Sequence, residues 1–327
     1  MDPHLANVSE LVRVAADRLV QQLGPMVNGS EQFPFDETLS RVTIAQDECL
    51  AALSQTGLWG RDNQMPSGDF WKIAGHVVGH GPLQLRAREK PHGYAGDFEM
   101  LDQIAEDRVA DELLSGAFDR YFQNQPAPRA VRNRTQEIAD RIVAVVRETP
   151  TNSAIKICSV GSGSASDVRC ALGQLNPSEI QRLDVHLLDL DPAALAFASR
   201  KLLELNCHAH SHRVNLFRLA KVPRLTELLD GSGLIFCSGL FDYLTHSDAV
   251  AMLRAFWSQL DDGGQLLAFN FAEHSSRAYM EWFGNWYLEY RDLDAMHQMA
   301  VDAGWQESDY AVAAEEENVN LFIKARK

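Results

Sequence analysis

The sequence predicts an α/β protein in which a helical N-terminal region precedes a parallel β-sheet covered by helices. Three features of the 327-residue chain support this. Apolar residues recur at helical spacing before residue 150, short apolar strands alternate with helices after Ile155, and a glycine-rich turn follows the first strand. We therefore expect a helical substrate-binding domain at 1–150 and a sheet domain at 151–327.

The helical domain is indicated by apolar residues at positions i, i+3 and i+4, with no convincing strand among them. The pattern occupies residues 10–23, 38–53, 99–114 and 130–148. Two loops containing glycine and proline, 57–69 and 88–99, interrupt it.

The sheet domain is indicated by strands and helices that alternate along the chain, as in a parallel sheet covered on both faces. Strands are predicted at residues 154–160, 184–190, 214–217, 233–239 and 264–271, and helices from 167, at 192–205 and at 247–260. Residues 304–327 contain two strand-like runs around an acidic turn. They predict a hairpin that closes the sheet with an antiparallel strand.

Composition narrows the classes of partner. The net charge of −15 disfavours binding to a phosphate backbone, and no apolar run reaches the roughly 20 residues that span a bilayer. The N-terminus lacks the basic start and apolar centre of a secretion signal. We expect a cytoplasmic protein with a small-molecule partner, no nucleic-acid binding and no membrane insertion.

The glycine-rich turn lies in "KICSVGSGSASDV", between a predicted strand and a predicted helix. Gly161 and Gly163 allow a ligand to approach the backbone there, next to free helix N–H groups. Ser166 stands where the dinucleotide-binding fingerprint has its third glycine, which disfavours a nicotinamide-dependent oxidoreductase. Asp189 and Asp191 end the next strand, where a carboxylate binds ribose hydroxyls, although Asp191 is equally suited to cap a helix.

Together these features resemble the class I S-adenosylmethionine-dependent methyltransferases, over residues 155–327. The resemblance implies a Rossmann-like sheet of seven strands with an antiparallel last strand, and S-adenosylmethionine as cofactor. It implies that Gly161 and Gly163 pass beneath the methionine part of the cofactor and that Asp189 binds its ribose. Further candidates for binding the cofactor are Ser162, Leu190, Arg134 and Ser238. For Arg134, which precedes the first strand, a solvated helix face remains an alternative to binding a carboxylate. The sequence departs from the family at Ala165, often a third glycine, and lacks an acidic residue after the third strand.

A narrower resemblance is carried by residues 90–101 ("KPHGYAGDFEML"), 236–245 ("FCSGLFDYLT") and 266–292. These segments are similar to bacterial methyltransferases of the extracellular-factor type, which make 3-hydroxy fatty acid methyl esters. The resemblance implies a substrate carboxyl group and a helical N-terminal lid.

Candidate residues for the reaction follow from these segments. In the first, Tyr94 and Asp97 either reach the substrate or cofactor, or serve as a packing residue and a helix N-cap. After the fourth strand, Phe241, Asp242 and Tyr243 are candidates for the active-site wall, with core packing the alternative for Phe241. We assign catalytic roles to Tyr94, Asp242 and Tyr243, and substrate-binding roles to Asp97, Phe241, Asn270 and Arg277.

The sequence leaves the acceptor open. A carboxylate acceptor is already ionised at neutral pH and needs hydrogen bonds and a cation, whereas an amine or alcohol requires a general base such as Asp242. The missing base motif favours O-methylation of a carboxylate. The alternatives are N- or O-methylation of an amino acid or secondary metabolite, and a non-catalytic binding protein; a homodimer also stays open.

No metal site is predicted. His208, His210 and His212 alternate in "HAHSH", but this run is expected in a loop with no carboxylate beside it. His76 and His80 lack the glutamate of a zinc-protease motif.

Overall fold

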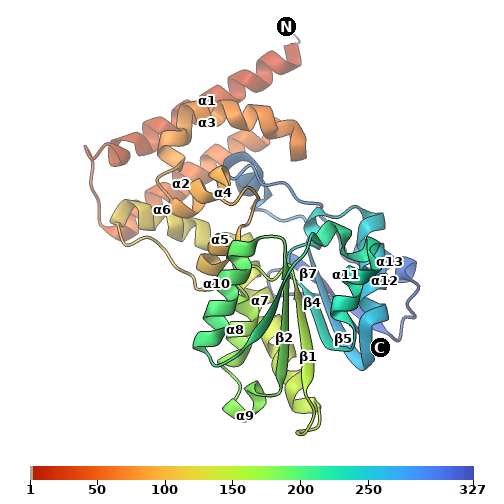
Figure 1. Cartoon of the computed structure of the whole chain (residues 1–327). Coiled ribbons are helices and arrows are strands. Elements are labelled where there is room, and N and C mark those ends of the chain that lie inside the picture. The colour runs from red at the N-terminus through yellow and green to blue at the C-terminus, as the bar shows by residue number, and fades with distance from the viewer. Residues whose placement is uncertain (1–2) are drawn as a thin grey trace. The chain divides into compact units, whose positions relative to one another are not determined.

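The computed structural model describes residues 3–327, with side chains from residue 7, and the chain divides into two compact units (Figure 1). The helical unit comprises Met1–Arg129 and His274–Leu288, so its first two residues lie outside the described part. The sheet unit comprises Ala130–Glu273 and Glu289–Lys327.

The helical unit confirms the helical character of the N-terminal region. Its helices are α1 (Pro3–Val27), α2 (Phe35–Ser54), α3 (Gln64–Val78), α4 (Pro82–Glu89), α5 (Phe98–Ala105) and α6 (Leu113–Gln123), with a 3₁₀ turn at Gly60–Asn63. Leu19, Leu53 and Phe70 are among its fully buried side chains, as the apolar spacing predicts. No described helix of the chain is both long enough and apolar enough to cross a membrane.

A segment from late in the sequence completes this unit. The π-helical turn η5 (Tyr279–Phe283) buries all five of its side chains, and the Phe283 ring stacks on that of Phe70 with 5.3 Å between centroids. Glu281 is buried here and accepts hydrogen bonds from Gly60 N (2.7 Å), Asn63 Nδ2 (3.1 Å) and Arg277 Nε (2.8 Å). Aromatic burial and these bonds explain why the segment groups with the N-terminal helices.

The sheet unit is built on seven strands, as predicted. They are β1 (Ile155–Val160), β2 (Leu183–Asp189), β3 (Ala209–Arg213), β4 (Ser232–Cys237), β5 (Leu260–Phe271), β6 (Tyr310–Ala314) and β7 (Asn320–Arg326). Their order is β3-β2-β1-β4-β5-β7-β6, and β7 runs antiparallel to both of its neighbours. This order, with one reversed strand, is the Rossmann-like methyltransferase sheet that the resemblance implies.

Helices cover the two faces of this sheet (Figure 1). They are α7 (Pro126–Glu148), α8 (Ser166–Leu172), α9 (Pro177–Ile180), α10 (Pro192–Glu204), α11 (Pro223–Thr226), α12 (His246–Gln259) and α13 (Leu293–Ala303). On β2, Leu187 packs in the core that α7, α8 and α10 cover, whereas Leu188 packs in the core beneath α12 and α13. Because successive side chains of a strand point to opposite faces of the sheet, an apolar core forms on each face, between the sheet and its helices.

The observed division differs from the predicted boundary at residue 150. Most of α7 belongs to the sheet unit, because Ile138, Ile142 and Val146 are fully buried in the same core as Ile157 of β1. Each such side chain contributes about 1.5–3 kcal/mol by burial. Helical periodicity identifies α7 as amphipathic but does not specify which core receives its apolar face.

The prediction of the third strand at residues 214–217 is wrong. The strand is Ala209–Arg213, and Leu216–Lys221 forms a 3₁₀ helix. Since β3 is the edge strand and much of it is exposed, it needs no apolar alternation, and its polar "AHSHR" sequence gave no strand signal.

Candidate functional site

The glycine-rich turn follows β1 at the carboxyl edge of the sheet. Gly161 has φ of 74°, Gly163 of 49° and Ala165 of 52°, all in the region that favours glycine. Gly161 N donates to the carbonyl of Leu188 at 2.8 Å, and Gly163 N donates to Asp189 Oδ2 at 2.9 Å. The turn is therefore fixed to the end of β2.

Asp189 is held by backbone donors. Its second oxygen, Oδ1, accepts from Asp191 N at 3.0 Å, and burial raises the pKa of this carboxyl above its usual value. The neighbouring Leu190 is half exposed. Asp191 caps α10 by accepting from Ala193 N at 2.8 Å, as in its capping alternative. The two carboxylates thus have separate structural roles.

The hydroxyl of Ser162 indicates that this turn suits a polar ligand. Ser162 is 6% exposed, and its Oγ is buried without a hydrogen-bond partner among the described residues. A buried hydroxyl that lacks a partner is unfavourable unless a ligand or water satisfies it. The orphaned hydroxyl, the left-handed turn and Asp189 fit the methionine and ribose portions of S-adenosylmethionine.

Arg134 belongs to α7 and is 4% exposed, which excludes the solvated helix face considered for it. Its Nη1 donates to the carbonyl of Ser238, just after β4, at 2.7 Å. Desolvation lowers the pKa of the guanidinium, and the charges of Asp242 and Asp167 oppose this shift. A buried cation thus lies with two carboxylates at the ends of β1 and β4.

Both carboxylates are strongly perturbed. Burial raises the pKa of Asp167 to about 6 and that of Asp242 to about 7, with Arg134 acting in the opposite direction on each. Asp167 was not identified from the sequence as a site residue, and its place in "SASD", at the start of the helix after the glycine turn, was the available signal. Perturbed carboxyl groups of this kind gather at functional sites, although structural networks also produce them.

Asp242 is part of a buried network after β4 and β5. Its Oδ1 accepts from Phe271 N at 2.6 Å. Arg291 donates to the carbonyl oxygens of Phe241 (2.8 Å) and Leu244 (2.6 Å) and to Asn270 Oδ1. Arg291 was also missed, because its role depends on packing between distant segments; it lies within the quoted residues 266–292.

The other predicted residues after β4 and β5 differ in exposure. Phe241 is fully buried, with its ring 6.3 Å from that of Phe256, as its core alternative describes. Asn270 is fully buried and donates to the carbonyls of Phe271 (2.9 Å) and Glu289 (2.8 Å). Tyr243 is 39% exposed. Of these three, Tyr243 presents the most surface to a ligand.

The remaining predicted residues belong to the helical unit. Asp97 caps α5 by accepting from the backbone N–H groups of Glu99 and Met100, and it also pairs with Arg86 Nε at 2.8 Å. This is the capping arrangement foreseen as one of its two alternatives. Tyr94 is 37% exposed.

Arg277 is also fixed within the helical unit. Besides donating to Glu281, its guanidinium lies over the ring of Trp59, 5.0 Å from the centroid. A cation stacked on an aromatic ring and paired with a buried carboxylate is well ordered.

Asp97→Ala is expected to lower the free energy of unfolding by about 3 kcal/mol, since it removes a helix cap and leaves Arg86 without its buried partner. Urea unfolding followed by circular dichroism measures this. Glu99→Ala is the matched control: it removes the more exposed of the two Arg86 partners and should cost less than about 1 kcal/mol. Equal losses for both variants would contradict the structural role of Asp97.

Comparisons with solved structures find proteins to which this chain is similar. The chain is similar to the crystal structure of a possible exported protein from Bordetella parapertussis, at 16% identity and a TM-score of 0.56, covering 100% of this chain and 99% of that one. The CurJ carbon methyltransferase matches at 13% identity and a TM-score of 0.48, over 100% and 93% of the two chains. Magnesium protoporphyrin IX methyltransferase from Synechocystis PCC 6803 with bound SAM matches at 13% identity and a TM-score of 0.43, over 62% and 84%. No protein-family model and no curated protein matches the sequence.

Proposed function

We propose that the protein is an S-adenosylmethionine-dependent methyltransferase that forms the methyl ester of a small-molecule carboxylate such as a 3-hydroxy fatty acid. The observation that carries this proposal is the hydrogen bond from Gly163 N to Asp189, which fixes the glycine turn beside a carboxylate at the carboxyl edge of the sheet. In open α/β sheets, ligands bind at this edge.

The cofactor is assigned to residues that follow β1, β2 and β4. Asp189 accepts the ribose hydroxyls, while Gly161, Ser162 and Gly163 contact the methionine portion, with the orphaned Ser162 hydroxyl supplying a hydrogen bond. Leu190 flanks the adenosine. Arg134 holds the Ser238 carbonyl in place and supplies positive charge for the cofactor's carboxylate. When bound, S-adenosylmethionine supplies a methyl group on a positively charged sulfur.

A carboxylate acceptor is favoured by the state of Asp242. This residue is 3% exposed, and its Oδ1 is occupied by the Phe271 N–H group. Although its raised pKa would suit a base, a carboxyl so enclosed offers little surface to an amine or alcohol whose proton it would have to take. An acceptor carboxylate is already ionised and forms the new carbon–oxygen bond without any proton transfer, so alignment and exclusion of water are sufficient.

The particular acceptor rests on the resemblance of residues 90–101, 236–245 and 266–292 to the extracellular-factor type. Tyr243 is assigned to the acceptor side of the site because it is the exposed member of the predicted residues Phe241, Asp242 and Tyr243. The catalytic roles of Tyr94, Asp242 and Tyr243 stay predictions, as do the homodimer and the cytoplasmic location. The same holds for the substrate-binding roles of Asp97, Phe241, Asn270 and Arg277.

The test is transfer of a labelled methyl group from S-adenosylmethionine to 3-hydroxy fatty acids of several chain lengths, followed by mild base. We expect label that is released as methanol, because methyl esters are hydrolysed whereas ethers and methylamines are not. The matched primary amides, which lack an ionised oxygen, should accept no label. Base-stable label would contradict carboxyl methylation and would make Asp242 the candidate base; label in none of the acids would contradict the acceptor class.

A further inference from the structure

We propose that Asp184, His186 and His210 form a binding site for a divalent transition-metal ion, of the Zn²⁺ class, at the edge of the β-sheet. The site lies on β2 and β3 and is independent of the proposed methyl transfer. It was not predicted because the "HAHSH" run was expected to lie in a loop without a carboxylate. In the structure this run is the edge strand, and β2 supplies both a carboxylate and a further imidazole.

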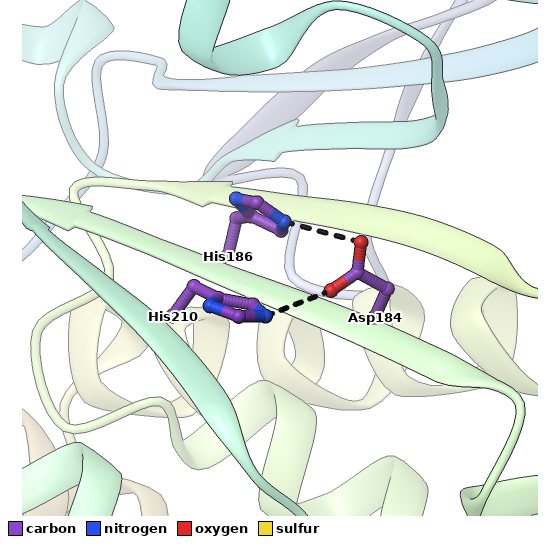
Figure 2. A group of neighbouring side chains, drawn as sticks. All are labelled: Asp184, His186 and His210. Atoms are coloured by element: carbon purple, nitrogen blue, oxygen red, sulfur yellow. Dashed lines mark hydrogen bonds and ion pairs between the residues drawn. The ribbon is translucent and has the colours of Figure 1, made fainter.

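Strand pairing brings these residues together. His186 of β2 lies opposite His210 of the parallel strand β3, and Asp184 is two residues earlier on the same face of β2. Figure 2 shows the Asp184 carboxylate directed at both imidazoles, one oxygen to each. His186 Nε2 is 3.2 Å from Asp184 Oδ2, and His210 Nε2 is 3.3 Å from Asp184 Oδ1.

These separations suit metal coordination. One ligand atom from each of the three residues lies within 4.8 Å of the others. In a tetrahedral zinc site with bonds of about 2.05 Å, ligand atoms are about 3.3 Å apart. Two imidazoles and a carboxylate are ligands that Zn²⁺, Co²⁺ and Ni²⁺ accept, whereas Mg²⁺ and Ca²⁺ prefer an all-oxygen set.

His212 lies where it can orient the His186 ring through a hydrogen bond. Its Nε2 is 3.0 Å from His186 Nδ1, and the two rings are stacked. If His186 Nδ1 carries the hydrogen and donates to His212, then His186 Nε2 presents its lone pair toward Asp184, the tautomer that binds a metal. Histidine ligands in metal sites are commonly oriented by such a hydrogen bond from the other ring nitrogen.

The surroundings of the site admit an ion. Lys156, opposite Asp184 on β1, is the neighbouring cation, and its ammonium group donates to the Asp230 carbonyl at 2.8 Å. The His210 side chain is 67% exposed, so an ion reaches the site from solvent and can complete its coordination with water.

The proposed role of the ion is to fasten the edge strand β3 to β2. The edge of a sheet lacks one neighbouring strand, and a shared metal adds a cross-link between ligands that are distant in the sequence. The melting temperature of the full chain should therefore rise when the metal is added.

The test uses the full, untagged chain, stripped with a chelator and titrated with ZnCl₂ in a calorimeter. We expect one equivalent to bind with a Kd in the micromolar range or below, and Asp184→Asn and His210→Gln to weaken binding at least about tenfold. His208→Gln is the matched control: it removes the first histidine of the run, which lies outside the cluster, and should leave the Kd unchanged. Lys156→Met should tighten binding, because it removes a neighbouring positive charge.

Circular dichroism establishes that each variant is folded. Because the His210 side chain is exposed, its replacement is expected to leave the fold intact. Titration with Co²⁺ provides a second readout: imidazole and carboxylate ligands give visible d–d bands without a thiolate charge-transfer band. Equal affinity in His210→Gln and His208→Gln, a thiolate band, or no binding at a millimolar concentration of Zn²⁺ would each overturn the proposal.

Discussion

Replacing Asp189 by alanine is expected to weaken S-adenosylmethionine binding by at least about 100-fold, because two charge-assisted hydrogen bonds to the ribose are lost. The same change removes the acceptor for Gly163 N and Asp191 N, so the turn after β1 also loses its attachment to β2. Isothermal titration calorimetry measures the affinity. Asp189→Asn, which keeps the size and one acceptor oxygen, should show an intermediate loss.

Asp191→Ala is the matched control for this prediction. It lies two residues away, and its carboxylate caps α10. Its removal should cost about 1 kcal/mol of stability and leave cofactor affinity nearly unchanged. If Asp191→Ala weakened binding as much as Asp189→Ala, the assignment of the ribose-binding carboxylate would be wrong.

The second large effect is a pH dependence of the protein's stability that arises from the titration of Asp242. Burial raises the pKa of this carboxyl to about 7, whereas in the unfolded chain it titrates near its usual value of 3.8. Between these values the folded state holds a proton that the unfolded state has released. The contribution of Asp242 to stability is therefore complete below about pH 4 and is lost as the pH rises through about 7.

Asp242→Asn should remove this dependence, because an amide oxygen can still accept from Phe271 N and carries no charge at any pH. The stability of the variant relative to the natural protein should rise by about 4 kcal/mol between pH 4 and pH 8. Urea unfolding at several pH values gives this difference. Asp261→Asn, at an exposed position of β5, should show no such trend. A constant difference across the range would show that Asp242 is ionised throughout.

The sequence predicts the elements that carry a strong local pattern. Apolar runs identify β1, β2, β4 and β5, and the acidic turn with its flanking runs identifies the closing hairpin. The edge strand β3 was missed because it has one neighbouring strand and much of it is exposed, so polar residues can form it. The assignment of α7 was missed because an amphipathic stripe does not reveal which core it enters.

The candidate sites divide in the same way. Gly161, Gly163 and Asp189 were identified because the turn and the strand end are local features with a recognisable spacing. Asp167 and Arg291 became evident only through their partners in the folded protein. The Asp184 cluster depends on the register between β2 and β3, which no spacing within either strand specifies.

Direct binding of S-adenosylmethionine to the purified full chain tests whether the glycine turn and Asp189 form its binding site, and NAD⁺ and NADP⁺ are titrated in parallel. We expect a single site per chain for S-adenosylmethionine with a Kd in the micromolar range, and no measurable affinity for either dinucleotide. Binding of a dinucleotide in its place, or no binding of S-adenosylmethionine at a millimolar concentration, would contradict the assignment of the glycine turn and Asp189 to a methyltransferase site.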